Sequence, residues 1–293
     1  MPYGRPPQLR AVLLRLAVLV GVWAGLVGLL VAAGEVVIHS SALTDFDHHA
    51  TRVVVSSRTP ALNSAMKVMT WLGSWVALLV TAVVIAALVI ARRLPVLAAV
   101  VGVFAWAGEA GGVAIGKAAI GRERPPRAIW LVHAHGWSFP SGHSAVACLA
   151  FAILALCVAT LARNRAVSIL GWLIAGLAIA ATAFSRVELG VHWTTDVIAS
   201  IVFVTSWLTA IAISLGGRLR PPEPLADQAG SPEPRPRRDE VLFASAERPR
   251  PGGQPSLNAA TGRKRAVMLA GQLSLNAATR RKRAVMLAGQ SSL

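Results

Sequence analysis

The sequence predicts an all-α protein: an integral membrane bundle of six transmembrane helices with a disordered C-terminal tail. Hydrophobic residues make up 55% of the 293 residues and charged residues only 14%, a balance typical of membrane proteins. A helix needs about 20 residues to cross a hydrocarbon layer of about 30 Å. Six apolar stretches have roughly that length: residues 11–34, 69–91, 95–116, 144–162, 166–184 and 194–215.

The basic residues predict how these spans are oriented, because short cytoplasmic loops carry an excess of Lys and Arg. Arginine pairs stand before the first span, between spans two and three, and between spans four and five: Arg5 and Arg10, Arg92 and Arg93, Arg163 and Arg165. The first apolar run exceeds the core of a secretory signal, about 7–15 residues, so we expect an uncleaved helix. Both termini are therefore expected in the cytoplasm, with the loops 35–68, 117–143 and 185–193 on the outer face of the cell membrane.

The apolar pattern stops after the last span, which predicts a separate C-terminal segment. We expect a membrane domain over residues 1–216 and a Pro-rich, basic, disordered cytoplasmic tail over 217–293. The tail carries 14 Lys or Arg and 6 Asp or Glu, a net charge of +8, and a 17-residue sequence at 256–272 returns at 274–290. Its basic clusters are interpreted as a solvated extension or as a surface for anionic lipids; no nucleic-acid partner is expected.

Cations and histidines gather in the three loops expected on the outer face. All seven histidines lie in these loops or at their ends: His39, His48, His49, His133, His135, His143 and His192. Lys117, Arg122, Arg124 and Arg127 follow the third span, and Arg186 follows the fifth. Cations at an outer surface run against the charge rule, so we interpret this cluster as an anion site.

Two short groups supply donors that suit a phosphoryl group. In KAAIGRERP, Lys117 stands seven residues before Arg124. Together with Arg186, these residues offer one compact ammonium group and two planar guanidinium groups with several N–H donors. In PSGH, at residues 140–143, Ser141 adds a hydroxyl and Gly142 permits close approach of the backbone. The free N–H groups at the start of the fourth span also favour an anion.

A third group, SRVELGVHWTTD, predicts a nucleophile. His192 and Asp196 are four residues apart, so on a helix they share one face, and the carboxylate can fix the imidazole tautomer. The other ring nitrogen of His192 is then free to attack. His143, with a reference pKa of about 6.5, is the candidate general acid.

Taken together, the three groups resemble the signature of the type 2 phosphatidic acid phosphatase superfamily, which also includes the vanadium haloperoxidases. The pattern there is Lys-x6-Arg-Pro, then Pro-Ser-Gly-His, then Ser-Arg-x5-His-x3-Asp, and the resemblance covers about residues 60–215. It implies a phosphohistidine on His192, oriented by Asp196, with His143 as the acid. It also implies that no metal or other cofactor is needed and that the phosphate is bound by Lys117, Arg124, Ser141, Gly142 and Arg186.

The expected function is removal of a phosphate from a lipid phosphate or diphosphate, such as a polyprenyl diphosphate, phosphatidic acid or phosphatidylglycerol phosphate. Two alternatives stay open: a membrane protein that only binds or transports phosphorylated lipids, and a vanadate-dependent haloperoxidase-like enzyme. Membrane lipids are the expected partners, and the sequence does not indicate an oligomeric state.

The roles of five ionisable residues stay open. DFDHH contains Asp45, Asp47, His48 and His49, which suit solvated loop residues, a divalent metal site, or a cap that contacts the substrate. Glu109 lies deep in the third span, either as a functional group or as a protonated or paired one. The glycines beside it, Gly108, Gly111 and Gly112, are interpreted as permitting close helix packing.

Overall fold

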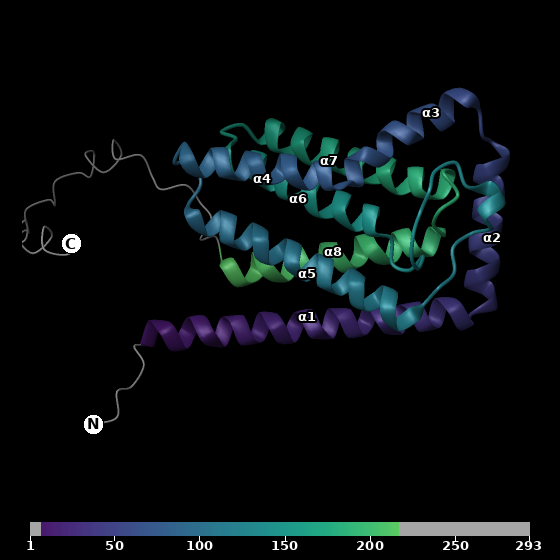
Figure 1. Cartoon of the computed structure of the whole chain (residues 1–293). Helices are drawn as coiled ribbons and strands as arrows, with labels where there is room; N and C mark the ends of the chain where they lie inside the picture. The colour runs from purple at the N-terminus through teal and green to yellow at the C-terminus, as the bar shows by residue number, and fades with distance from the viewer. Residues whose placement is uncertain (1–6, 217–293) are drawn as a thin grey trace, which may run out of the picture. The chain divides into compact units, whose positions relative to one another are not determined.

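The computed structural model describes residues 7–216, and within that range the chain is helical and has no strand. Figure 1 shows long helices lying side by side, with one helix crossing their ends. The α-helices are α1 (Pro7–His39), α2 (Ser41–Ser56), α3 (Pro60–Met69), α4 (Trp75–Ile90), α5 (Val96–Ile120), α6 (Gly142–Leu161), α7 (Arg165–Glu188) and α8 (Thr194–Leu215). Two 3₁₀ turns, η1 (Thr70–Gly73) and η2 (Arg127–Ile129), complete the set.

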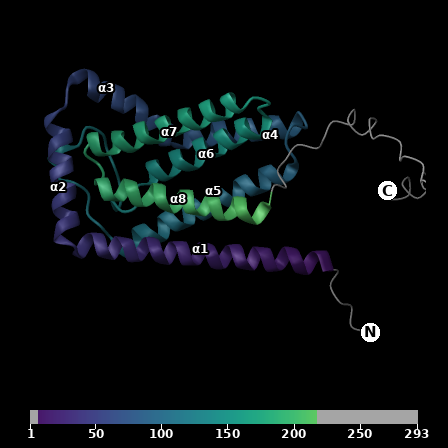
Figure 2. The ribbon, with the colours of Figure 1, turned by 180° about the vertical axis from the view of Figure 1, so that it is seen from behind.

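Five of these helices are long and apolar enough to cross a bilayer: α1, α5, α6, α7 and α8. A sixth span is obtained when α3, η1 and α4 are counted as one segment, bent by 46°. The prediction of an all-α membrane bundle with up to six spans is thus confirmed, and the protein is a multi-pass membrane protein. Seen from behind, the long helices keep the same parallel arrangement (Figure 2).

The second span differs from the predicted 69–91, because the helix breaks at Gly73 and Ser74. The Ser74 side chain accepts a hydrogen bond from Val76 N at 3.2 Å and so caps a new helix, α4, of 16 residues. A Cβ on Gly73 would lie 2.4 Å from the carbonyl oxygen of His143, so only glycine lets η1 pack against the start of α6. At 1.5 Å per residue, α4 is about 24 Å long, which is short for a complete span.

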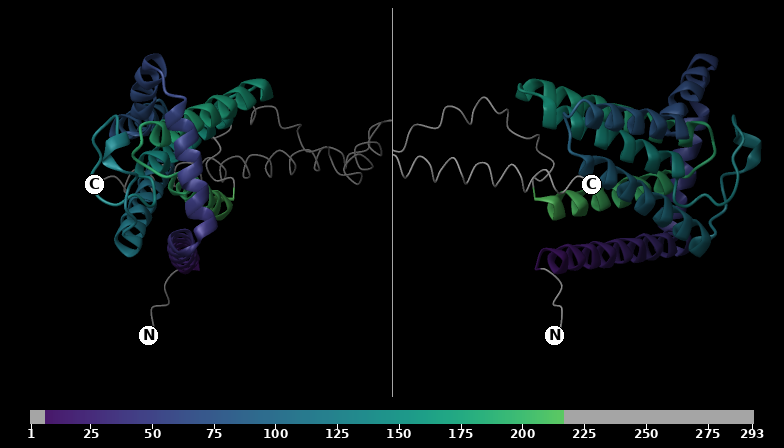
Figure 3. Two further views of the ribbon diagram at one scale, coloured as in Figure 1. Left: turned by 90° about the vertical axis from the view of Figure 1, so that its right-hand side faces the viewer. Right: turned by 60° about the vertical axis from the view of Figure 1, so that its left-hand side comes forward.

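The segment 35–68, expected as a loop, is mainly helical, and here the prediction was wrong. Ser40 accepts a hydrogen bond from Leu43 N and starts α2; Thr59 accepts one from Leu62 N and starts α3, with Pro60 in the first turn. With 16 and 10 residues, α2 and α3 are each too short to cross a bilayer alone. Viewed along the bundle, α2 crosses the ends of the other helices (Figure 3).

The core lies where α1, α5, α6 and α8 meet, and small residues allow the helices to approach closely. A Cβ on Gly108 would meet the Trp207 ring at 2.5 Å, and one on Gly112 would meet Phe203 at 2.2 Å. Trp207 also donates a hydrogen bond to Ala105 O at 3.1 Å, which fastens α8 to α5. The packing interpretation of the glycines fits these contacts.

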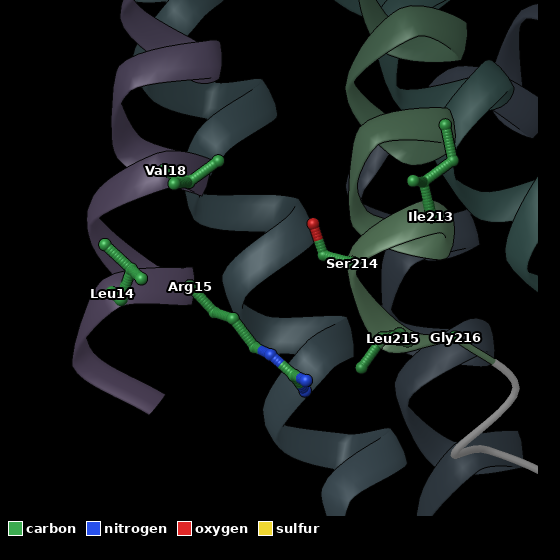
Figure 4. Close-up of a pocket in the computed structure, with 7 residues that line it drawn as sticks. All are labelled: Leu14, Arg15, Val18, Ile213, Ser214, Leu215 and Gly216. Carbon is green, nitrogen blue, oxygen red and sulfur yellow. The ribbon is translucent and has the colours of Figure 1, made fainter. Parts of the chain in front are cut away.

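The two ends of the bundle differ in chemistry. Pro7 and Leu215 lie at one end, where a hollow of about 470 Å³ between α1 and α8 is lined by apolar residues, Arg15 and Ser214 (Figures 1 and 4). The opposite end, crossed by α2, contains the ends of α5 and α7 and the starts of α6 and α8. We call it the α2 end. The proposed tail and its duplication, 256–272 and 274–290, lie outside the described residues.

Replacing Gly112 by alanine tests the α5–α8 packing. The added methyl group meets the buried ring of Phe203, and overpacking of this kind costs about 1–3 kcal/mol of stability. We therefore expect a lower thermal unfolding midpoint in detergent, measured by tryptophan fluorescence. The matched control is Gly28→Ala in α1, where the methyl group would have no neighbour within 4 Å; equal midpoints for both variants would contradict this packing.

Candidate active site

All three sequence groups meet at the α2 end of the bundle. Lys117 lies in the last turn of α5, and Arg124 lies in the loop that follows it. Ser141 is the N-cap of α6, so Gly142 and His143 occupy its first turn. Arg186 lies in the last turn of α7, His192 in the connection to α8, and Asp196 in the first turn of α8. Residues separated by up to 79 positions are thus brought to one end of the fold.

The His192 ring lies between a carboxylate and a guanidinium. Its Nδ1 is 3.4 Å from Asp196 Oδ2, and its Nε2 is 3.0 Å from Nη1 of Arg124. Because an arginine N–H only donates, Nε2 must be the unprotonated nitrogen and Nδ1 the one that carries the proton. The Nδ1–Oδ2 distance is longer than a standard hydrogen bond, as catalytic hydrogen bonds often are outside the Michaelis complex. His192 thus faces Asp196, but not as two residues of one helix as predicted, because α8 begins only at Thr194.

Asp196 is fully buried and is surrounded by hydrogen-bond donors. Its Oδ2 accepts from Ser138 Oγ at 2.5 Å and from the backbone N–H of Trp193 at 2.9 Å, and its Oδ1 accepts from Arg122 Nη1 at 2.6 Å. The negative charge also lies at the N-terminus of α8, where the helix dipole favours it. These contacts fix the carboxylate, and through it the imidazole.

The three predicted phosphate-binding cations lie within range of one another's charge. Lys117 Nζ donates to Trp137 O at 2.5 Å, and Arg124 donates to the carbonyl oxygens of residues 135, 136, 137 and 191, so both hold the loop before α6. Arg186 is buried and donates to Thr70 Oγ1 on η1, whereas its Nε has no hydrogen-bond partner within residues 7–216. Three cations this close favour an anion with several oxygens.

The start of α6 adds backbone donors to this cluster. Ser141 N donates to the carbonyl oxygen of Asp196 at 3.2 Å, which ties the PSGH turn to α8. The N–H groups of Gly142, His143 and Ser144 stand in the first helical turn, where no intrahelical acceptor exists. His143 is half-buried and lies within range of the charges of Lys117, Arg124 and Arg186. Gly116 allows this turn to approach α5, because a Cβ there would lie 2.8 Å from Pro140.

Burial controls the protonation of His192. Loss of hydration lowers its pKa to about 3; Asp196 opposes this shift, and the positive charges of Arg124 and Arg186 add to it. Burial also lowers the pKa of Arg124, partly offset by Asp196. The imidazole of His192 is therefore neutral at neutral pH, the form that a nucleophile requires.

Sequence reasoning missed several contacts that support the site, including those of Arg122, which it named only as one cation of the expected anion cluster. Arg122, Ser138 and Thr195 form a buried set of donors around Asp196 and Asp47, and Thr70 binds Arg186. Arg122 and Ser138 stand two and three residues from the motif positions Arg124 and Ser141, so proximity was the available signal. No pattern in the sequence indicated that Thr70 and Thr195 belong to the site.

The open residues are placed apart from the phosphate cluster. Asp47 is buried against Arg122 and Thr195, whereas Asp45 and His49 are exposed and His48 packs edge-on against Trp193 at 4.8 Å. No three His, Cys, Asp or Glu side chains within residues 7–216 are grouped so as to hold a metal ion. Glu109 is buried in α5, eight residues and about 12 Å along the helix from Lys117, so it does not belong to this site.

The chain is similar to a known protein family and to solved structures of membrane proteins. The family model of the PAP2 superfamily matches residues 95–220. The chain is similar to the structure of a transmembrane PAP2-type phosphatidylglycerolphosphate phosphatase from Bacillus subtilis, with 25% sequence identity and a TM-score of 0.56 over 66% of this chain and 96% of that one. It is also similar to LpxE from Aquifex aeolicus, with 23% identity and a TM-score of 0.44 over 57% of this chain and 93% of that one. No curated protein matches the chain.

The matched range contains every motif position, from Lys117 to Asp196, and these positions converge in the fold. The Bacillus subtilis protein is matched over nearly its whole length and is itself a membrane phosphatase. The expected resemblance to the PAP2 superfamily is confirmed by this match over residues 95–220.

Proposed function

We propose that this protein is an integral membrane phosphatase that removes a phosphate from a lipid phosphate or diphosphate through a phosphohistidine on His192. The observation that carries the proposal is the His192 ring itself. Its Nδ1 faces the buried Asp196, and its unprotonated Nε2 faces Arg124, one of three cations grouped beside it. Binding alone needs the cations but not the imidazole–carboxylate pair, which favours catalysis over binding or transport.

In the first step, the lone pair on His192 Nε2 attacks the phosphorus atom and the bond from phosphorus to the leaving oxygen breaks. His143 donates a proton to that oxygen, so the lipid product leaves as a neutral alcohol or as a lipid monophosphate. Lys117, Arg124 and Arg186 bind the three remaining oxygens and stabilise the charge that spreads over them. Asp196 stabilises the positive imidazole ring through Nδ1–H.

In the second step, water attacks the phosphohistidine. His143, now neutral, accepts a proton from the water, and the bond from Nε2 to phosphorus breaks. Inorganic phosphate leaves, and the electron pair returns to Nε2. The proton that His143 gives to the leaving oxygen in the first step is thus replaced by one from water in the second, and the cycle closes.

The surroundings of the site favour a lipid as the substrate. An apolar groove of about 380 Å³ lies between α4, α5 and α6, with Trp75 and Leu149 among its lining residues. Leu149 is six residues along α6 from His143, a distance of about 9 Å. A phosphate at the start of α6 can thus be bound while an acyl or prenyl chain follows the apolar helix faces. Phosphatidylglycerol phosphate, polyprenyl diphosphate and phosphatidic acid are the candidates.

Replacing His192 by alanine removes the proposed nucleophile. Purified protein in detergent with a chelator should release phosphate from at least one of these three lipids, and His192→Ala should lower the rate about 10³-fold or more. The assay is the release of inorganic phosphate. His39→Ala is the matched control, because this exposed ring contacts only Glu35 of its own helix and should keep full activity.

Two outcomes of that assay would contradict the proposal. If the wild-type protein releases no phosphate from any of the lipids, the alternative of a protein that binds or transports phosphorylated lipids is favoured. A His192→Ala variant with full activity would place the nucleophile elsewhere.

The protonation of His192 is a second test. Since burial lowers its pKa to about 3, the ring should stay neutral from pH 8 to pH 5. We expect its ¹⁵N chemical shifts, assigned by comparison with His192→Ala, to show an unprotonated Nε2 and to remain constant over this range. A transition with a midpoint near 6.5, the value of a solvated histidine, would show that the ring is not buried as described.

We also propose that the α2 end lies on the outer face of the membrane, with both termini in the cytoplasm. In a Cys148→Ala, Cys157→Ala background, a cysteine placed at exposed His133, in the loop before α6, should react with a membrane-impermeant maleimide on intact cells. A cysteine at Arg93, in the turn between α4 and α5, should react only after the cells are opened. The reverse pattern would invert the orientation.

A further inference from the structure

Asp47 is a buried carboxylate whose contacts the phosphatase mechanism does not use. It lies on α2 and is fully shielded from solvent. Oδ2 accepts hydrogen bonds from Arg122 Nη2 at 2.7 Å and from Thr195 Oγ1 at 2.5 Å, and Oδ1 accepts one from the backbone N–H of Thr195 at 2.9 Å. A buried charge with this many partners has a fixed position.

Arg122 connects this carboxylate to the site. One nitrogen of its guanidinium donates to Asp47, and the other donates to Asp196 Oδ1 at 2.6 Å and to Thr195 Oγ1 at 2.8 Å. The guanidinium also lies over the Trp193 ring, 5.5 Å from its centroid. Because the planar guanidinium of Arg122 is bound on both sides, it cannot rotate without breaking a buried ion pair.

The chain of contacts continues to the nucleophile. Because Arg122 occupies Oδ1 of Asp196, Oδ2 is left for Ser138, the N–H of Trp193 and His192 Nδ1. The orientation of the carboxylate thus determines which oxygen faces the imidazole. Loss of the Asp47 contact frees one end of Arg122 and lets the Asp196 carboxylate turn.

We propose that Asp47 is a positioning residue: through Arg122 and Asp196 it fixes the His192 ring in the tautomer that leaves Nε2 free to attack. The role rests on the proposed phosphatase function. Asp47 makes no contact with Lys117, Arg124 or Arg186, so it affects the nucleophile and not the binding of phosphate. It also lies outside residues 95–220, the range of the family model, so α2 contributes to a site that the motifs do not cover.

The test is Asp47→Asn in the full-length protein. The amide has nearly the same shape, but it carries no charge, and its single acceptor oxygen cannot serve both Arg122 and the backbone N–H of Thr195. Loss of an outer-shell partner of a functional group typically costs 10–100-fold in metal sites. We expect the single-turnover rate of phosphate release to fall about 10-fold with KM within twofold of the wild type. Asp45→Asn removes the same charge from an exposed position of the same helix and should leave both constants unchanged.

The second variant, Arg122→Lys, keeps a charge between the two carboxylates but cannot bind both as a fork does. Its single-turnover rate should fall as well. Because both substitutions break one chain of contacts, the rate of the double variant should match that of the slower single variant. If either single variant does not fold, the other still tests the proposal.

The ¹⁵N spectrum of His192 gives a readout that does not require turnover. In the wild type the proton should lie on Nδ1, whereas Asp47→Asn should show both tautomers. This measurement can succeed even if no lipid phosphate is hydrolysed, so failure of the proposed function and failure of the positioning role are distinguishable.

Three results would overturn the positioning role of Asp47. The first is a folded Asp47→Asn protein with the wild-type rate and an unchanged tautomer. The second is a raised KM at constant rate, which would make Asp47 a binding residue. The third is fully additive rate losses in the double variant, which would show that Asp47 does not act through Arg122.

Discussion

The structure of the α2 end depends on one buried carboxylate, that of Asp196. An ionised carboxylate without solvent is strongly unfavourable unless it is paired and hydrogen-bonded. Arg122 supplies the counter-charge, and Ser138 and the backbone N–H of Trp193 supply hydrogen bonds. Removing one partner of such a pair costs about 3–5 kcal/mol, because the other charge is left buried without compensation. The same contacts that stabilise Asp196 also determine how it faces His192.

The groups that surround Asp196 and its partner Arg122 come from separate parts of the chain. The loop after α5 brings Arg122 and Ser138, while α2 brings Asp47 against Arg122 from outside the bundle. Glycine at position 73 lets η1 reach the start of α6. Lys117, Arg124, Arg186 and His192 then lie close enough for their charges to act on one another.

The sequence predicted the spans and the motif residues because both depend on local information. Hydropathy identifies α1, α5, α6, α7 and α8, and fixed spacing identifies residues such as His192. The break before α4 was not predicted, since it arises from contact between Gly73 and His143, which are far apart in sequence. Asp47 and Arg122 were not paired for the same reason: 75 positions separate them, and only the fold shows that their charges meet.

The most direct test of the account is identification of the phosphorylated residue. Protein that is turning over a ³²P-labelled lipid phosphate is quenched in alkali, in which phosphohistidine survives and phosphoserine esters do not, and is then digested for mass spectrometry. A mechanism through His192 predicts a single labelled peptide with the phosphate on His192 and no label in His192→Ala. Label on another residue, or phosphate release without any phosphoenzyme in wild-type protein, would contradict a mechanism that passes through His192.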